Sequence, residues 1–287
     1  MSAAGPPQGA NRSPSGGSER SERGGPVSSD ADVSNGAIIR VVAMDAGYDG
    51  FPAILENVNF DVARGQVFGI LGGSGCGKST LLKHMIGLIP PLAGQAWIDG
   101  ADIVTADGPD LLAIRRKFGV MYQSGALFGS MTLLENVRLP LEVWTELPDD
   151  AIDLIARMKL KLVGLEAFTG HMPAELSGGM QKRAGIARAM ALDPSILFLD
   201  EPSSGLDPIT AASLDATIRR LSDSLGVTFV IVTHDLGSAF VAMDRVILLD
   251  VRAKGIIAEG DPRQLRDKDD DPRVRAFFRR EAEPVAA

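Results

Sequence analysis

"VFGILGGSGCGKST", residues 67–80, decides the fold of this chain of 287 residues. The run VFGIL is short and apolar, which is the pattern of a strand buried on both faces of a sheet. Gly72 and Gly77-Lys78-Ser79 have the spacing G-x-x-x-x-G-K-[ST], and a helical pattern starts at Lys78. A strand, a glycine-rich loop and a helix in this order predict a phosphate-binding loop, whose backbone N–H groups and helix N-terminus face the phosphates.

The loop supplies candidate ligands for a nucleoside triphosphate and its Mg²⁺ ion. We expect Lys78 to reach the β- and γ-phosphates and the Ser79 hydroxyl to bind the metal. Cys76 is the only cysteine, and we interpret it as a small residue that fits a tight turn. The candidate nucleotide-binding residues of the loop are Gly72, Gly73, Ser74, Gly75, Cys76, Gly77, Lys78, Ser79 and Thr80.

A second apolar run ends directly in two carboxylates. In "SILFLDEPSSGLDP", residues 195–208, the run is followed by Asp200 and Glu201. Ligands of open α/β sheets bind at the carboxyl ends of the strands. We expect Asp200 to hold Mg²⁺ through water, and Glu201 to polarise the attacking water, as a general base or by orienting it. The two stretches together predict a nucleoside triphosphatase.

The remaining patterns predict an α/β fold with a parallel sheet. A third apolar run, VTFVIV (227–232), follows a helical pattern that starts at Ile209, and another helical pattern starts at Leu236. Such alternation of strands and helices is typical of parallel sheets. Residues 38–66 alternate and carry turn signals, which favours an antiparallel β subdomain. A helical insert is expected over about 128–184, and a hairpin over 245–260.

The ends of the chain differ from this middle part. Residues 1–36 have almost no large apolar side chains, so we expect a disordered Gly/Ser/Pro-rich tail. The folded domain is expected over 37–270, followed by a basic helix and tail over 271–287.

Composition excludes some classes of protein and suggests a compartment. The chain has 29 basic and 37 acidic residues, a net charge of −8, which argues against capture of nucleic acid. No apolar stretch approaches the ~20 residues of a membrane span, the N-terminus lacks a signal peptide, and the single cysteine fits a reducing compartment. We therefore expect a soluble, cytoplasmic chain. Two histidines, His84 and His171, match no motif and are interpreted as structural.

With these motifs in place, about residues 38–270 resemble the ATP-binding cassette (ABC) ATPases. The most discriminating motif is LSGGM (176–180), which resembles the ABC signature. Gln123 in VMYQSGALF falls where the family has its Q-loop glutamine. SSGLD (203–207) resembles the D-loop, and His234 in VTHD resembles the switch histidine. The resemblance implies a P-loop NTPase (RecA-like) core, an N-terminal antiparallel β subdomain and an α-helical subdomain, which bind and hydrolyse ATP with Mg²⁺.

The resemblance explains why a helix starts with a serine and two glycines. ABC ATPases work as head-to-tail dimers, and the signature of one copy caps the γ-phosphate in the other copy's loop. Ser177, Gly178 and Gly179 would present a hydroxyl and bare N–H groups to that phosphate. Asp207 would lie on the dimer interface.

Three further residues take roles from the resemblance alone. His234 would contact the γ-phosphate. Gln123 would contact the metal and link the nucleotide state to a membrane permease. Tyr48 would stack on adenine, with Phe51 as a near neighbour. The catalytic set is therefore Glu201, Lys78, His234 and Gln123.

Short stretches suggest one branch of the family. Met180 stands where the commonest signature has Gln, and "QSGALF", "LDP" followed by "IT" and "DPRVRAFF" accompany it. The chain thereby resembles the ATPase of the MCE-type (Mla) phospholipid transporters. The implied partners are a homodimer mate, a permease, a periplasmic MCE protein and a small STAS-type protein, at the cytoplasmic face of the inner membrane. The substrate would be glycerophospholipid or another apolar envelope lipid.

Three alternatives stay open at this point. The chain could serve another import or export system, because substrate contacts lie in other chains. It could be a non-transport ABC ATPase acting on DNA or the ribosome, although the single cassette, the acidic balance and the lack of a long coiled coil argue against this. It could also be a nucleotide-binding regulatory subunit with negligible hydrolysis.

Overall fold

The computed structural model describes residues 36–123, 125–268 and 270–281. The predicted N-terminal tail, apart from Gly36, and residues 282–287 of the predicted C-terminal tail lie outside these ranges. None of the helices in the described ranges has the length and apolar character that a bilayer span needs. The strands are β1 (Ala37–Ala46), β2 (Leu55–Ala63), β3 (Val67–Gly72), β4 (Ala93–Ile98), β5 (Ala101–Asp102), β6 (Phe118–Met121), β7 (Ile196–Asp200), β8 (Thr228–Thr233), β9 (Arg245–Asp250) and β10 (Gly255–Gly260). The helices are α1 (Lys78–Met85), α2 (Gly108–Arg115), α3 (Leu133–Trp144), α4 (Asp149–Leu162), α5 (Gly178–Ala189), α6 (Pro208–Leu225), α7 (Leu236–Ala242), α8 (Pro262–Lys268) and α9 (Pro272–Arg279), with single 3-10 turns at Glu166–Phe168 and Pro173–Glu175.

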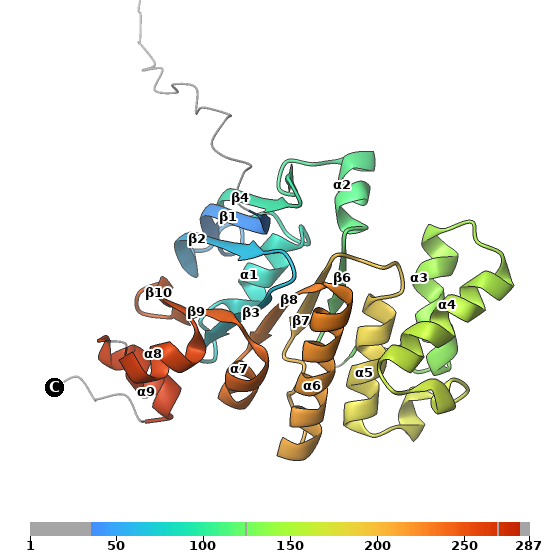
Figure 1. Ribbon diagram of the computed structural model, residues 1–287. Coiled ribbons are helices and arrows are strands. Elements are labelled where there is room, and N and C mark those ends of the chain that lie inside the picture. Colours follow the sequence, from blue (N-terminus) through green and yellow to red (C-terminus); the bar gives the residue numbers. More distant parts are fainter. Residues whose placement is uncertain (1–35, 124, 269, 282–287) are drawn as a thin grey trace, which may run out of the picture. The chain divides into compact units, whose positions relative to one another are not determined.

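The larger sheet is parallel except at one edge (Figure 1). Its strand order is β10-β9-β3-β8-β7-β6, and only β10 pairs antiparallel, with β9. Every residue of β3 and β8 is buried, because helices or the second sheet cover both faces. The structure therefore confirms the predicted α/β fold, and it explains why these strands have continuous apolar sequences.

The N-terminal strands form a separate antiparallel sheet. Its order is β2-β1-β4-β5, so β1 lies in the middle and pairs with both neighbours. One core cluster joins this sheet to α1 and to one face of the parallel sheet, where Phe68 and Ile70 of β3 point. A second cluster takes Val67 and Leu71, the alternate residues of β3, together with side chains of α3 to α7. The period of two along a strand thus divides the core into two layers.

Helices α3 and α4 pack against each other and against α5, beside the parallel sheet (Figure 1). Helix α3 starts with a capping box in which Thr132 and Glu135 satisfy each other's backbone N–H groups. These helices fall within the insert that was predicted over about 128–184. The boundaries proposed for the domains stay a prediction.

The fold gathers three loops at one edge. The carboxyl ends of β3, β8 and β7 are neighbours in the strand order. The glycine-rich loop follows β3, His234 and Asp235 follow β8, and Glu201 follows Asp200, the last residue of β7. Sequence-distant motifs therefore meet at one place.

Candidate functional site: a nucleotide site at the carboxyl edge of the sheet

The glycine-rich loop between β3 and α1 has a backbone that side chains would disrupt. Gly77, the residue before α1, has φ 98°, a left-handed conformation that L-residues rarely adopt. Gly72 has φ 154°, and a Cβ there would lie 2.5 Å from Cys76 Sγ and 2.7 Å from the Leu249 carbonyl oxygen. Cys76 is itself buried at 1% exposure, and burial raises the pKa of its thiol. The cysteine thus acts here as a small packing residue.

Lys78 and Ser79 open α1 at the end of this loop. The Lys78 ammonium donates to the carbonyl oxygens of Gly72 and Gly73, both at 2.9 Å. The Ser79 hydroxyl donates to Asp200 at 3.2 Å, so the loop after β3 and the end of β7 are in direct contact. Burial raises the pKa of Asp200, and the Ser79 hydrogen bond opposes this shift. A cation beside Asp200 would favour the ionised carboxylate.

The other loop residues form an exposed rim and a link to Tyr48. Gly73, Ser74 and Gly75 are exposed at the tip of the loop. Thr80 is buried, and its hydroxyl lies 3.5 Å from the Tyr48 hydroxyl. Tyr48 is 43% exposed, so its hydroxyl is held near Thr80 while part of the residue remains accessible to a ligand.

Glu201 follows β7 in a constrained conformation. Its φ of 49° is left-handed, which is rare for a residue with a side chain. His234 Nδ1 lies 2.9 Å from Glu201 Oε1, and the Thr233 hydroxyl donates to Glu201 Oε2 at 3.3 Å. Since a carboxylate only accepts, these partners place the imidazole proton on Nδ1. Two donors, from the last residue of β8 and the residue after it, therefore fix the orientation of the Glu201 carboxylate.

Lys182 joins three of the motifs, and sequence reasoning missed it. Its ammonium donates to the carbonyl oxygen of Gln123 and, at 3.5 Å, to that of Glu201. The side chain is only 7% exposed, and this burial lowers the pKa of Lys182 while Glu201 and Asp200 oppose the shift. The Gln123 amide is turned toward the Ser204 hydroxyl at 3.3 Å. The only sequence signal for Lys182 was its place in the basic run after the LSGGM motif.

The two glycines at the start of α5 are not equivalent. Ser177 is the N-cap and accepts from the backbone N–H of Met180 at 3.3 Å. A Cβ on Gly179 would overlap with Thr210 Cγ2 of α6, whereas the nearest atom to a Cβ on Gly178 lies at an ordinary 3.4 Å. Packing within the chain therefore accounts for Gly179 but leaves Gly178 without an internal explanation.

Asp207 is the N-cap of α6. Its carboxylate accepts from the backbone N–H groups of Ile209 at 3.0 Å and Thr210 at 3.1 Å, and from the Thr210 hydroxyl at 2.6 Å. These hydrogen bonds lower its pKa. The structure thus gives Asp207 a local role in shaping the loop that follows Glu201, and its place on a dimer interface stays a prediction.

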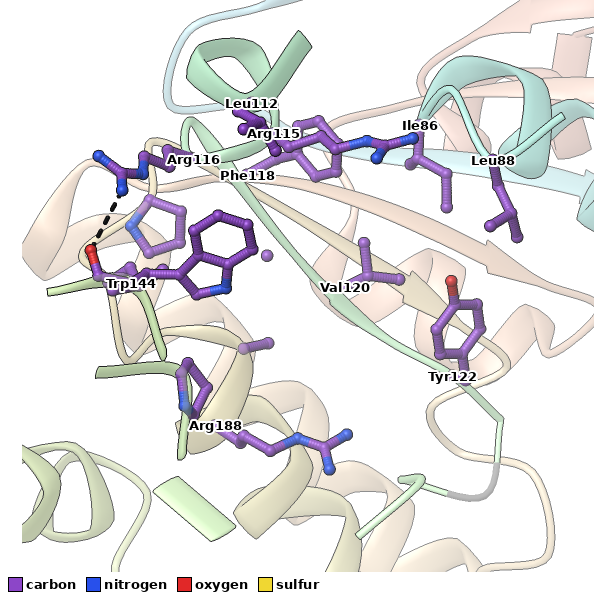
Figure 2. Close-up of a pocket in the computed structure, with 15 residues that line it drawn as sticks. Ile86, Leu88, Leu112, Arg115, Arg116, Phe118, Val120, Tyr122, Trp144 and Arg188 are labelled. Carbon is purple, nitrogen blue, oxygen red and sulfur yellow. Dashed lines mark hydrogen bonds between the residues drawn. The ribbon is translucent and has the colours of Figure 1, made fainter. Parts of the chain in front are cut away.

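A groove of about 380 Å³ lies between the parallel sheet and the helices α3 and α5 (Figure 2). Trp144 forms one wall, with the Arg116 guanidinium 5.6 Å from its ring centroid and bonded to its carbonyl oxygen. Tyr122 lies one residue before Gln123, so the groove ends next to the Gln123 loop. The groove combines apolar and cationic side chains: Ile86, Leu88, Leu112, Phe118, Val120, Tyr122, Pro140, Trp144, Ala189, Leu192 and Pro194, with Arg115, Arg116 and Arg188.

Arg188 of α5 lines this groove and binds the Gln123 loop. Its guanidinium donates to the carbonyl oxygens of Ala126 at 2.6 Å and Gly125 at 3.2 Å, and lies 5.7 Å from the Phe128 ring centroid. Helix α5 therefore holds this loop at two points, through Lys182 and Arg188.

Comparisons with known proteins agree on one family. A family profile described as "ABC transporter" matches residues 55–204. The "Probable ribonucleotide transport ATP-binding protein mkl" of Mycobacterium leprae is 41% identical over 88% of this chain and 72% of its own length. The "Intermembrane phospholipid transport system ATP-binding protein MlaF" of Haemophilus influenzae is 38% identical over 82% of this chain and 88% of its own length.

A solved structure agrees in fold and assembly. The dimeric ATP-binding cassette MJ0796, in a post-hydrolysis state bound to ADP and Pi, superposes with a TM-score of 0.70 at 33% sequence identity. The match covers 78% of this chain and 98% of that one. This chain thus shares its fold with a cassette that was solved as a dimer with ADP and Pi.

Proposed function

The chain belongs to the ABC transporter family as an ATP-hydrolysing subunit, and on that premise we propose that it powers lipid transport between the inner and outer membranes of a bacterium. The observation that carries the ATPase assignment is the contact between the glycine-rich loop and the end of β7, where Ser79 meets Asp200 at 3.2 Å. The lipid assignment rests on the relative whose name states phospholipid transport. The ATPase assignment and the lipid assignment thus rest on separate observations.

The nucleotide would bind along α1 and its preceding loop. The loop N–H groups and Lys78 would bind the phosphates, and the partly exposed Tyr48 ring would bind adenine. Ser79 and Asp200 fit a Mg²⁺ ion, because a hydroxyl and a carboxylate are the oxygen ligands that this ion prefers. Bound there, the ion would neutralise phosphate charge. The Gln123 amide is turned to Ser204, so a metal contact from Gln123 would require that loop to move.

Hydrolysis would use Glu201 to orient and deprotonate water. His234 and Thr233 hold both carboxylate oxygens, which limits the rotation of the side chain. Lys182 donates to the backbone carbonyl oxygen of Glu201 and so holds its main chain as well. This arrangement supports the role that phosphoryl transfer demands most, namely positioning and charge neutralisation.

A second copy of the chain would complete each site. The solved relative with ADP and Pi is a dimer, and a Cβ on Gly178 would come no closer than 3.4 Å to the atoms packed around it in the described residues. Ser177 and Gly178 would then face the γ-phosphate of the partner at the N-terminus of α5. Asp207 would lie at the same interface.

The groove beside Gln123 would take the permease. A helix from a membrane subunit could place apolar side chains against Trp144 and Leu88, and backbone carbonyls or acidic groups against Arg115 and Arg116. Movement of α5 on ATP binding would reach the groove through Lys182 and Arg188. We place the chain at the cytoplasmic face of the inner membrane, with an MCE-domain protein and a small STAS-type protein as further partners.

The test is affinity purification of the tagged chain from native membranes in mild detergent, followed by mass spectrometry. We expect a multi-span permease together with an MCE-domain protein. A permease of another class, including one for nucleotides as the mycobacterial relative's name suggests, would overturn the lipid assignment. Ribosomal or DNA-repair proteins alone would overturn transport itself.

A matched pair of variants tests the groove in the same experiment. Leu88 lines the groove and is 53% exposed, and Val251 lies outside it and is 56% exposed. Leu88→Arg should abolish co-purification of the permease, because it puts a charge into an apolar contact beside Arg115, which has the same charge. Val251→Arg should leave co-purification unchanged. Equal recovery with both variants would show that the permease binds elsewhere.

A further inference from the structure

Helix α1 carries a buried histidine that no motif explains. His84 is 0% exposed, although its ring has two polar atoms. The backbone N–H of Gly47 donates to Nε2 at 3.1 Å, and Nδ1 lies 3.1 Å from the carbonyl oxygen of Ile89. An N–H group only donates and a carbonyl oxygen only accepts. These partners therefore require the neutral ring with its proton on Nδ1.

The histidine fixes the segment that carries Tyr48. Gly47 directly precedes Tyr48, and Thr80 lies one helical turn before His84 on the same face of α1. The Tyr48 hydroxyl lies 3.5 Å from Thr80, while the Gly47 N–H is bonded to His84. One face of α1 thus holds this segment at two consecutive residues, by two side chains one turn apart.

The segment has little freedom to adapt if this bond is lost. A Cβ on Gly47 would lie 2.8 Å from Leu92 Cδ1 and 3.3 Å from the Ala53 Cα atom, so the backbone is closely packed on two sides. The Phe51 N–H donates to the Tyr48 carbonyl oxygen at 3.0 Å and closes a turn. The His84 ring links Gly47, just before this turn, to Ile89 in the segment that follows α1.

We propose that His84 is a positioning residue for the nucleotide base: it anchors the Gly47 N–H so that the Tyr48 ring stands beside Thr80, over the helix that follows the phosphate loop. The inference rests on the proposed function, because Tyr48 has a role only if the chain binds a nucleotide. It adds to that function that a single helix, α1, positions both the residues that bind the base and those that bind the phosphates. His84 touches no substrate and acts through Gly47 and Tyr48.

Two variants of the full chain test this role. His84→Leu fills a similar volume but has no acceptor, so it leaves the Gly47 N–H unpaired. His84→Gln can offer its side-chain oxygen near the position of Nε2. The ligands are Mg-ATP and Mg-tripolyphosphate, which has the phosphates but no base, and the dissociation constants are measured by calorimetry.

We expect His84→Leu to weaken ATP binding about tenfold, the equivalent of one hydrogen bond. Tripolyphosphate binding should change by less than about twofold, and His84→Gln should restore most of the ATP affinity. Equal losses for both ligands would show a merely structural role and overturn the proposal, as would wild-type affinity in His84→Leu. Failure of the wild-type chain to bind either ligand would instead overturn the proposed function.

A second measurement keeps the proposal testable if His84→Leu does not fold. Protonation of Nε2 removes the acceptor, so the ratio of ATP to tripolyphosphate affinity in the wild type should fall at acid pH. Burial lowers the pKa of His84, and the nearby Lys83 ammonium acts in the same direction, which places the fall below pH 6.5. The other titratable groups near the ring have other partners or lie in solvent. The Asp45 carboxylate accepts from the Asn57 N–H, the Tyr48 hydroxyl is near Thr80, and Asp49 lies in the exposed turn. Residues 86–92 include no titratable side chain. A ratio that does not change with pH in the wild type, or that changes equally in His84→Gln, would overturn the proposal.

Discussion

At the scale of one residue, Asp215 shows how burial changes the protonation of a carboxyl group close to the catalytic loops. It lies on α6, is 3% exposed and accepts from the Ser238 hydroxyl at 2.9 Å. The Ser238 oxygen also lies 3.3 Å from an Asp235 carboxylate oxygen, and Asp235 directly follows His234. Burial raises the pKa of Asp215 to about 6, and the Asp235 carboxylate adds to this shift. The folded chain therefore favours the protonated acid.

Asp215→Asn should stabilise the protein at neutral pH. Because the pKa of Asp215 is raised in the folded state, its contribution to stability is fully present below its unfolded value of 3.8 and is lost as pH rises through about 6. The loss amounts to at most about 3 kcal/mol, since one pKa unit corresponds to about 1.4 kcal/mol. Asn cannot ionise and still accepts from Ser238. Urea unfolding should therefore show the variant to be more stable at pH 7.5, with the advantage gone near pH 4; an advantage that is equal at both pH values would contradict the argument.

Residues in contiguous motifs could be predicted, whereas residues defined by distant partners could not. Lys78, Ser79 and Asp200 follow from local spacing, and the fold brings Ser79 to Asp200. Lys182 and His84 have no such local signal. Their roles depend on Gln123 and Gly47, which lie 59 and 37 positions away in the chain. A single sequence does not contain these pairings.

At the scale of elements, the central strands of the parallel sheet could be predicted from the sequence, whereas some elements outside them could not. β3, β7 and β8 are covered on both faces, so each appears as a continuous apolar run in the sequence. β4 (AGQAWI) and the short helix α2 (GPDLLAIR) were not predicted. Each has few buried residues and includes Gly or Pro, so tertiary pairing rather than local preference determines its structure.

The start of α5 gives a prediction about elements that pack together. Gly179→Ala should destabilise the chain by about 1–3 kcal/mol, because the new methyl overlaps with Thr210 Cγ2. The Thr210 side chain has little room to rotate, since its hydroxyl donates to Asp207 at 2.6 Å. Gly178→Ala is the matched control and should leave stability unchanged or raise it, because Ala favours the helix. Denaturant unfolding of the isolated chain measures both.

Thr210→Ser identifies the cause. It removes Cγ2 but keeps the hydroxyl that bonds to Asp207, so the double variant Gly179→Ala/Thr210→Ser should recover most of the lost stability. If the double variant is as unstable as Gly179→Ala alone, the clash between α5 and α6 is not the reason for the glycine.

At the scale of the whole molecule, one chain holds the two halves of the proposed site at different places. Helix α1 follows β3, whereas α5 packs against β6, with β8 and β7 between these strands. Three strand spacings correspond to about 14 Å, and α1 and α5 are drawn well apart in Figure 1. A site that needs both Lys78 and Ser177 on one phosphate therefore needs two copies of the chain, arranged head to tail.

Mixing two inactive variants tests this arrangement. Lys78→Ala removes the phosphate contact of the loop, and Ser177→Arg places a bulky side chain at the start of α5, so neither variant alone should hydrolyse ATP. In a dimer of one copy of each, one site contains both defects and the other contains an intact loop and an intact α5 N-terminus. An equal mixture should therefore recover up to about a quarter of the wild-type rate of phosphate release, since about half of the dimers are mixed and each has one intact site. If each site were built within one chain, every copy in the mixture would stay defective, and phosphate release would remain at the level of the separate variants at every mixing ratio.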